Sequence, residues 1–380
     1  MQYRRFGRTD FQISVFSLGT MRCLSSGANL EQTLSHALDL GINHIETAQG
    51  YGASEGYLGQ ALAALSRERD LSQLFITTKI TPQPSADAMA AAIDTSLRRL
   101  GRSCVQGLAL HGINTPQHLA WILDPHGCMA AVRQAVTEGK VQHVGFSTHA
   151  PLDLILSCMA SQQFEFVCLH YNLFFQRNLP ALLAAQQQDL GVFIISPADK
   201  GGRLYQPSDR LKQLCHPIEP LRLNSRFLLS QAAVSTLSVG PATPQELDWP
   251  LSVADDCGPL TSVERHCLLA LDQAADAVLG GDRCQQCYGC LPCPEEIQIP
   301  EVLRLRNLSL AYEMQSYAQY RYGMFEHAGH WFPGRKAIHC THCGDCLPRC
   351  PYDLAIADLV HDAHQRLQVR ERRRLWADDP

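Results

Sequence analysis

Short apolar runs alternate with amphipathic stretches from residue 1 to about residue 240. The apolar runs are rich in β-branched and aromatic residues and predict eight strands: Val15–Leu18, His44–Glu46, Phe75–Lys79, Val105–Leu110, Val141–Ser147, Phe166–His170, Phe193–Ser196 and Thr236–Val239. The stretches between them are rich in Ala, Leu and Gln and predict helices: Leu30–Leu40, Ser54–Leu65, Ala86–Leu100, Met129–Glu138, Leu152–Ser161 and Leu179–Gln188. Strands that are separated by helices indicate a parallel sheet buried on both faces, and eight such units match the size of a (β/α)8 TIM barrel. An open, doubly wound sheet is the alternative, but no GxGxxG motif follows the first strand.

Turn signals support this division into elements. Glycines follow several of the predicted helices, as expected for the position just past a helix C-terminus: Gly41, Gly101, Gly139 and Gly191. Before the first strand, Gln2–Phe6 and Phe11–Ile13 flank a Gly-Arg-Thr-Asp turn. We therefore expect an N-terminal hairpin that caps the floor of the barrel.

The pattern changes after the eighth strand. Residues 241–262 are rich in Pro, Asp and Thr, which indicates a linker or cover loop. Beyond them, Val263–Leu279 and Pro300–Met314 carry apolar residues at helical spacing. The sequence thus predicts a barrel domain at residues 1–245, a linker at 246–262 and a mostly α-helical domain at 263–380.

Eight of the sixteen cysteines lie in two motifs within this last domain. The motifs are Cys284-x2-Cys287-x2-Cys290-x2-Cys293-Pro294 and Cys340-x2-Cys343-x2-Cys346-x3-Cys350-Pro351. Three thiolates at this spacing can wrap a loop around a cubane, and in two-cluster ferredoxins the fourth cysteine ligates the other cluster. We therefore predict two 4Fe–4S clusters, with zinc sites and disulfides as the weaker alternatives. The other eight cysteines are expected to be small core residues: Cys23, Cys104, Cys128, Cys158, Cys168, Cys215, Cys257 and Cys267.

Composition narrows the cellular context. Hydrophobic residues make up 46% of the chain, which excludes a disordered protein, and the formal net charge of −5 gives no field that attracts nucleic acid or an anionic membrane. No apolar segment is long enough to span a membrane, and no secretory signal is recognisable. We therefore expect a cytoplasmic protein that binds neither nucleic acid nor membrane. A basic run near the C-terminus is expected to be a solvated helix end, because acidic residues follow it: Arg370, Arg372, Arg373, Arg374, Asp378 and Asp379.

Four side chains suited to carbonyl reduction lie at the predicted strand ends. Glu46 ends the second strand, Lys79 ends the third, His111 follows the fourth, and Tyr51 lies in the loop after the second. In a (β/α)8 barrel, these strand ends and the loops beyond them form the active site. A phenol can donate a proton at neutral pH when a lysine stabilises its phenolate, and a carboxylate can hold that lysine in its charged form. Each of the four also has a purely structural interpretation, as part of a rim ion pair or as a packed ring.

These residues lie in motifs that resemble the aldo-keto reductase signature. The motifs are Gly41-Ile42-Asn43-His44-Ile45-Glu46-Thr47-Ala48, Tyr51-Gly52, Ser54-Glu55, Leu58-Gly59-Gln60-Ala61-Leu62, Thr77-Thr78-Lys79, Leu110-His111, Val144-Gly145-Phe146-Ser147 and Ser196-Pro197. The cysteine-rich tail resembles the branch of that family with a C-terminal, α-helical ferredoxin-like domain. The resemblance implies a small carbonyl or alcohol substrate and an NADP(H) or NAD(H) cofactor.

The resemblance also implies roles for individual residues. Tyr51 would be the general acid, Lys79 and Glu46 its charged partners, and His111 the group that orients the substrate. Cofactor contacts would come from residues at later strand ends: Ser147, Thr148, Ser196 and Gly240. By the ferredoxin precedent, Cys350 would complete the cluster of the first motif and Cys293 that of the second.

Several positions depart from the family pattern. Glu46 stands where the family usually has Asp, Thr148 where it has Asn, and Cys168 where it has Gln. No Lys or Arg lies between Val239 and Ala254, so the sequence does not favour NADP over NAD. Moreover, a hydride carries two electrons and a 4Fe–4S cluster passes one, yet no flavin fingerprint is recognisable. The clusters could be structural, or they could exchange electrons with an external one-electron carrier. The alternative function is an iron–sulfur electron-transfer or redox-sensing protein on a catalytically degenerate barrel.

Overall fold

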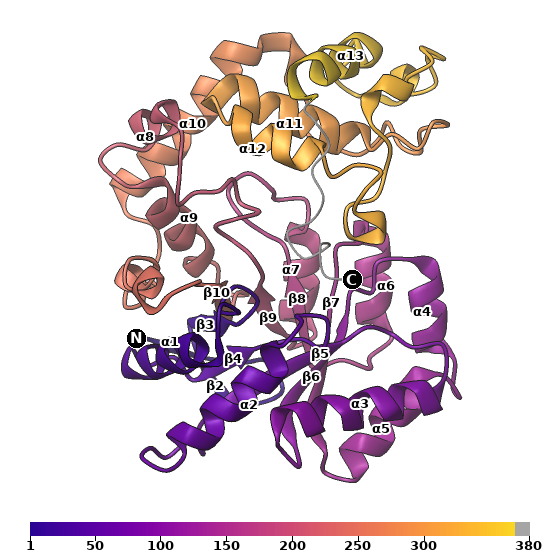
Figure 1. Ribbon diagram of the computed structural model, residues 1–380. Coiled ribbons are helices and arrows are strands. Elements are labelled where there is room, and N and C mark those ends of the chain that lie inside the picture. The colour runs from indigo at the N-terminus through magenta and orange to yellow at the C-terminus, as the bar shows by residue number, and fades with distance from the viewer. Residues whose placement is uncertain (369–380) are drawn as a thin grey trace. The chain divides into compact units, whose positions relative to one another are not determined.

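The structure is a computed structural model that describes residues 1–368 (Figure 1). The chain forms two compact units, one from Met1–Gly201 and Asn224–Pro259, the other from Gly202–Leu223 and the residues from Leu260 on. Residues 202–223 therefore group with the helical unit rather than with the barrel. One hydrogen bond helps to attach these residues to the helical unit: the Ser208 hydroxyl donates to the Tyr312 carbonyl at 2.5 Å.

Eight parallel strands close into a barrel in the first unit, in the order β10-β3-β4-β5-β6-β7-β8-β9. The strands are β3 Phe16–Gly19, β4 His44–Glu46, β5 Phe75–Ile80, β6 Val105–His111, β7 Val141–Ser147, β8 Phe166–Leu169, β9 Gly191–Ile194 and β10 Thr236–Val239. Each coincides with a predicted strand to within a few residues. The (β/α)8 fold is thus confirmed, and the doubly wound alternative is wrong because β10 pairs with β3 and closes the sheet.

Helices surround this barrel, as Figure 1 shows for α1 to α7. They are α1 Gly27–Asp39, α2 Ser54–Leu65, α3 Ala86–Leu100, α4 Pro116–Leu123, α5 Cys128–Thr137, α6 Leu152–Ala160 and α7 Leu179–Gln187, and α9 Pro220–Leu229 follows later in the chain. The sequence pattern missed α4 and α9. Two 3-10 turns, Pro244–Leu247 and Pro250–Val253, occupy the start of the expected linker.

An aromatic cluster fills the floor of the barrel. The expected hairpin is present, with β1 Tyr3–Arg5 antiparallel to β2 Gln12–Ser14. Phe6 follows β1 and packs edge-on against Phe75, with ring centroids 5.7 Å apart. The expectation that Gly191 ends a helix is wrong: this residue begins β9, and a Cβ atom there would meet the Phe6 ring at 2.4 Å. Only glycine fits at position 191, because the Phe6 side chain packs directly on the backbone there.

The second unit is mostly helical. Its helices are α8 Asp209–Cys215, α10 Ser262–Leu279, α11 Ile299–Tyr312, α12 Gln315–Tyr322 and α13 Ile356–Leu367, and four 3-10 turns lie between them: Gly280–Asp282, Gly329–Trp331, Ala337–His339 and Leu347–Arg349. Helix α10 begins with a capping box between Thr261 and Glu264. Helix α11 is buried on nearly all sides and packs against α10, α12 and α13, so it forms the core of this unit.

No helix among the described residues is long and apolar enough to cross a membrane. The basic run at Arg370–Arg374 lies outside the described residues.

Candidate functional site

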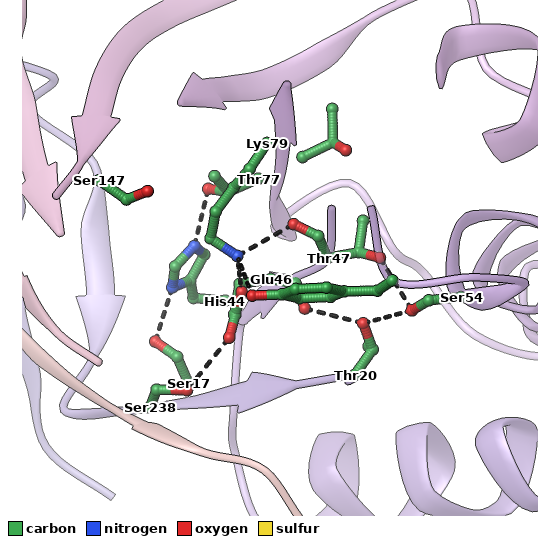
Figure 2. A network of polar contacts seen from close by, with 12 residues as sticks. Ser17, Thr20, His44, Glu46, Thr47, Ser54, Thr77, Lys79, Ser147 and Ser238 are labelled. Carbon is green, nitrogen blue, oxygen red and sulfur yellow. Dashed lines mark hydrogen bonds and ion pairs between the residues drawn. The ribbon is translucent and has the colours of Figure 1, made fainter. Parts of the chain in front are cut away.

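The candidate catalytic residues meet at the C-terminal ends of three neighbouring strands. Glu46 is the last residue of β4, Lys79 lies near the end of β5, and His111 is the last residue of β6. Tyr51 lies in the loop between β4 and α2. Figure 2 shows the Lys79 and Glu46 side chains pointing toward each other within a network of polar contacts.

Lys79 and Glu46 form a buried ion pair. The Lys79 Nζ contacts the Glu46 carboxylate and also donates to the Thr47 carbonyl at 3.0 Å. Lys79 is only 2% exposed and Glu46 only 5%. Burial lowers the pKa of Lys79 to about 8, while the contact with the Glu46 carboxylate places a counter-charge beside the ammonium. Glu46 therefore keeps its contact with Lys79 although its side chain is one methylene longer than the family's Asp.

Tyr51 lies beside this ion pair. The Lys79 Nζ is 3.4 Å from the Tyr51 hydroxyl and 4.9 Å from the centre of its ring. Burial raises the pKa of the Tyr51 phenol well above its usual value, so the phenol carries its proton at neutral pH. His111 packs edge-on against the Tyr51 ring, with centroids 5.6 Å apart. The structure thus brings together all four residues that the strand ends predicted.

Two residues that sequence reasoning missed position the Glu46 carboxylate. Ser238, on β10, donates a hydrogen bond to Glu46 Oε1 at 3.2 Å. Gly19 ends β3, and a Cβ atom built there would come within 2.8 Å of Glu46 Oε1 and 2.9 Å of Ser238 Oγ. The absent side chain at position 19 therefore gives the glutamate its space. A glycine at the end of the first strand was the only signal in the sequence.

We expect the Gly19→Ala variant to lower kcat for carbonyl reduction about 100-fold, because displacement of a catalytic group by about 1 Å has that cost. Its added methyl group would push the Glu46 carboxylate away from Lys79. The matched control is Gly56→Ala in α2, where a Cβ atom meets nothing within 4 Å. Steady-state kinetics and thermal melts of both variants check this. Full activity of a folded Gly19→Ala protein would contradict it.

Ser147 and Thr148 connect two loops at the same rim. Ser147 Oγ accepts a hydrogen bond from the Gly112 N–H at 3.0 Å. Thr148 is fully buried, and its hydroxyl donates to the Ile113 carbonyl at 2.7 Å and accepts from the Ala150 N–H at 3.0 Å. The Thr148 hydroxyl therefore fixes the loop after β7.

Ser196 and Gly240 follow β9 and β10. Ser196 has a φ of +50°, a left-handed conformation that is uncommon for a non-glycine residue. Arg22, from the loop after β3, donates to the Gly240 carbonyl at 2.9 Å and pairs with Glu246 at 3.0 Å. A guanidinium therefore lies next to Gly240, although the sequence after β10 contains no nearby cation.

Four cysteines from the two motifs surround one cavity in the helical unit. The cavity is lined by Cys284, Cys287, Cys290 and Cys350 together with Leu303 and other residues. Burial and the neighbouring thiolates of Cys287 and Cys350 raise the pKa of Cys284. Three cysteines of the first motif thus meet the last cysteine of the second.

The other four cysteines also lie together. Burial raises the pKa of Cys346, and the thiolates of Cys340, Cys293 and Cys343 raise it further. The Arg349 guanidinium donates to the Pro292 carbonyl at 2.8 Å, and a Cβ atom at Gly289 would meet the Arg349 carbonyl at 2.9 Å. Each motif therefore sends its last cysteine toward the other motif's first three.

All sixteen cysteines are free thiols, so the disulfide alternative is wrong in this structure. Within residues 1–368, no three His, Cys, Asp or Glu side chains converge on a point where a single metal ion could bind. Six of the eight cysteines outside the motifs are buried, as expected for core residues, whereas Cys104 and Cys257 are partly exposed.

Comparison with known families assigns both units. Residues 16–255 match the model of the aldo/keto reductase family, and residues 283–355 match the model of a 4Fe-4S dicluster domain. The chain therefore belongs to the aldo/keto reductase family, and it carries a 4Fe–4S domain of the dicluster type after its barrel.

Individual relatives agree with this assignment. The chain is 31% identical over 170 residues to the L-glyceraldehyde 3-phosphate reductase of Escherichia coli (strain K12). This match covers 40% of this chain and 46% of that protein. It is 32% identical over 162 residues to the 6-dehydroglucose reductase of Novosphingobium aromaticivorans, covering 38% of this chain and 51% of that protein. The matches span about half the length of these two relatives. The solved structure of the aldo-keto reductase AKR11C1 from Bacillus halodurans has the same fold, with a TM-score of 0.60 at 22% identity over 71% of this chain and 95% of that one.

Proposed function

We propose that this protein is a cytoplasmic oxidoreductase that reduces a small carbonyl compound to an alcohol with NADPH or NADH. The observation that carries the proposal is the position of the Lys79 Nζ, which contacts Glu46 and lies 3.4 Å from the Tyr51 hydroxyl. An ammonium in this position stabilises the phenolate that remains when the phenol gives up its proton. The names of the two reductase relatives, which refer to a sugar phosphate and a sugar, support a small polar carbonyl substrate.

Each of the four residues has a separate task in this mechanism. Tyr51 donates its proton to the carbonyl oxygen of the substrate as general acid. Lys79 stabilises the resulting phenolate, and Glu46 keeps Lys79 charged and directed at Tyr51. His111, which packs against the Tyr51 ring, hydrogen-bonds the substrate carbonyl and orients it.

A nicotinamide nucleotide would supply the hydride when bound. Ser147, Ser196 and Gly240 would contact it, since Ser147 ends β7 and the other two follow β9 and β10 at the same rim. Thr148 would act by holding the loop after β7 in place, because its hydroxyl bonds to Ile113 in the loop after β6 and to Ala150 in its own loop.

The helical unit would hold two 4Fe–4S clusters. Cys284, Cys287, Cys290 and Cys350 would ligate one of them, since these four line a single cavity. The other cluster would be ligated by Cys340, Cys343, Cys346 and Cys293. Each cluster has one exposed cysteine, Cys287 or Cys343, which supports electron exchange with an external one-electron carrier in addition to a structural role.

An anaerobic titration of cluster-loaded protein with NADPH and then NADH tests this function. The absorbance spectrum reports the clusters, and nucleotide fluorescence reports binding and oxidation in the presence of a carbonyl substrate. We expect binding and substrate-dependent oxidation of at least one nucleotide. Bleaching of the iron–sulfur band would show that nucleotide electrons reach the clusters. Failure to bind either nucleotide would reject the reductase function and favour an iron–sulfur redox protein on a degenerate barrel.

A further inference from the structure

Three nitrogen-bearing side chains converge at the rim of the barrel beyond the candidate cofactor contacts. His149 follows β7, His170 follows β8, and Lys200 lies in the loop after β9. The His170 Nε2 is 3.2 Å from the Lys200 Nζ and 3.2 Å from the His149 Nδ1. The two imidazole rings lie edge to face, with centroids 4.4 Å apart. None of the three has a part in the mechanism described above.

The hydrogen bonds determine the charge of this group. The His170 Nδ1 lies 3.1 Å from the Ile195 carbonyl, which can only accept, so Nδ1 carries a proton. In a neutral ring the Nε2 is then an acceptor, and it can receive a hydrogen bond from the Lys200 ammonium. The group therefore holds the positive charge of the Lys200 ammonium, which His170 positions by accepting one of its hydrogens. This charge suits an anion and disfavours a metal cation, which the ammonium would repel.

The backbone around each of the three residues is fixed. The His149 N–H donates to the Asn114 side chain at 2.7 Å, and the His170 carbonyl accepts from the Asn178 side chain at 2.9 Å. The Lys200 N–H donates to the Ser196 carbonyl at 3.1 Å. The next residue, Gly201, lies so close to the Pro197 carbonyl that a Cβ atom there would approach it to 1.9 Å. Such preorganisation lowers the ordering cost of binding a ligand.

Strand register relates this group to the candidate catalytic residues. His111 pairs with Ser147 across β6 and β7, and Ser147 pairs with Cys168 across β7 and β8. His149 and His170 each lie two residues beyond this row. Because neighbouring strands are about 4.8 Å apart, β8, which His170 follows, is about 10 Å along the sheet from β6, which ends at His111. The group therefore borders the rim at which the candidate catalytic residues lie.

We propose that His149, His170 and Lys200 form an anion-binding subsite that takes the phosphate or carboxylate group of the carbonyl substrate. This inference rests on the proposed reductase function and specifies its substrate class. The pyrophosphate of the cofactor has the same chemistry and is the other source of an anion at this rim, so the experiment must separate the two.

The test compares 4-oxobutanoate with butanal, two aldehydes that differ by a terminal carboxylate. The Lys200→Gln variant should raise KM for 4-oxobutanoate about 10- to 100-fold, as expected for the loss of a charge-assisted hydrogen bond, and leave KM for butanal unchanged. Lys140→Gln is the matched control: it removes the same charge from an exposed ion pair just before β7, at the opposite end of the barrel. A weaker nucleotide affinity, with both aldehydes affected equally, would assign the subsite to the cofactor and overturn the proposal.

Calorimetric titration of the cluster-loaded full chain with inorganic phosphate provides a readout independent of turnover. Phosphate should bind the wild-type protein and Lys140→Gln, but not Lys200→Gln. If the protein turns over butanal and phosphate binding is the same in all three, the subsite is wrong and the reductase function stands. Phosphate binding that depends on Lys200 in a protein that reduces no aldehyde would support the subsite and reject the reductase function. A Lys200→Arg variant keeps the positive charge and should retain phosphate binding. If it does, the loss of phosphate binding in Lys200→Gln is due to the lost charge rather than to misfolding.

Discussion

The Tyr51→Phe variant is expected to lose carbonyl reduction, with kcat falling about 100- to 10,000-fold, the usual contribution of a general acid. The substitution removes only the hydroxyl that lies 3.4 Å from the Lys79 Nζ and leaves the ring that packs against His111. Fold, iron content and nucleotide affinity should therefore be unchanged. Steady-state NAD(P)H oxidation with a carbonyl substrate, alongside fluorescence titration of the nucleotide, measures both parts of this expectation.

Tyr57→Phe is the matched control for this variant. Tyr57 lies in α2, close to Gly27 and away from the ion pair, so removal of its hydroxyl should leave kcat within about twofold of the wild type. If Tyr51→Phe keeps its turnover while the protein is folded and binds nucleotide, another group donates the proton. The role proposed for the Lys79–Glu46 pair would then be wrong as well.

Loss of Cys350 should remove one cluster, that of the opposite motif. We expect the Cys350→Ala variant to fall from about eight to about four iron atoms per chain, because Cys350 lines the cavity formed by the first motif. Iron analysis together with Mössbauer or electron paramagnetic resonance spectra of anaerobically prepared protein measures this change. Cys104→Ala, which changes a partly exposed cysteine in the barrel unit, should keep all of its iron.

Double variants decide which cysteines share a cluster. If Cys284 and Cys350 ligate the same cluster, Cys284→Ala added to Cys350→Ala should cost no further iron, since the two residues act as one unit. Cys340→Ala added to Cys350→Ala should remove both clusters. Pairing within each motif requires the reverse: the first double variant would lose both clusters and the second only one.

The sequence by itself determined the architecture. Alternating apolar and amphipathic segments specify strands and helices through their different periodicities, so the eight strands of the barrel were predicted to within a few residues. The positions of Glu46, Lys79 and His111 at strand ends followed from the same pattern, because parallel strands bring their C-terminal ends to one rim. Cysteine spacing was equally informative, since the residues of one iron–sulfur motif are neighbours in the chain.

Only the tertiary structure decided contacts between residues that are far apart in the chain. Gly19 and Ser238 contact Glu46 because β3, β4 and β10 are neighbours in a closed sheet, which no local pattern encodes. His149, His170 and Lys200 follow three different strands, and no sequence motif links them. The closed barrel brings their side chains together. Helices α4, α8 and α12 were missed for a related reason: short helices have few turns over which to show a period, and packing against neighbouring elements stabilises them. Local periodicity thus determined the elements of this protein, while chain closure and side-chain packing determined which residues face one another at its sites.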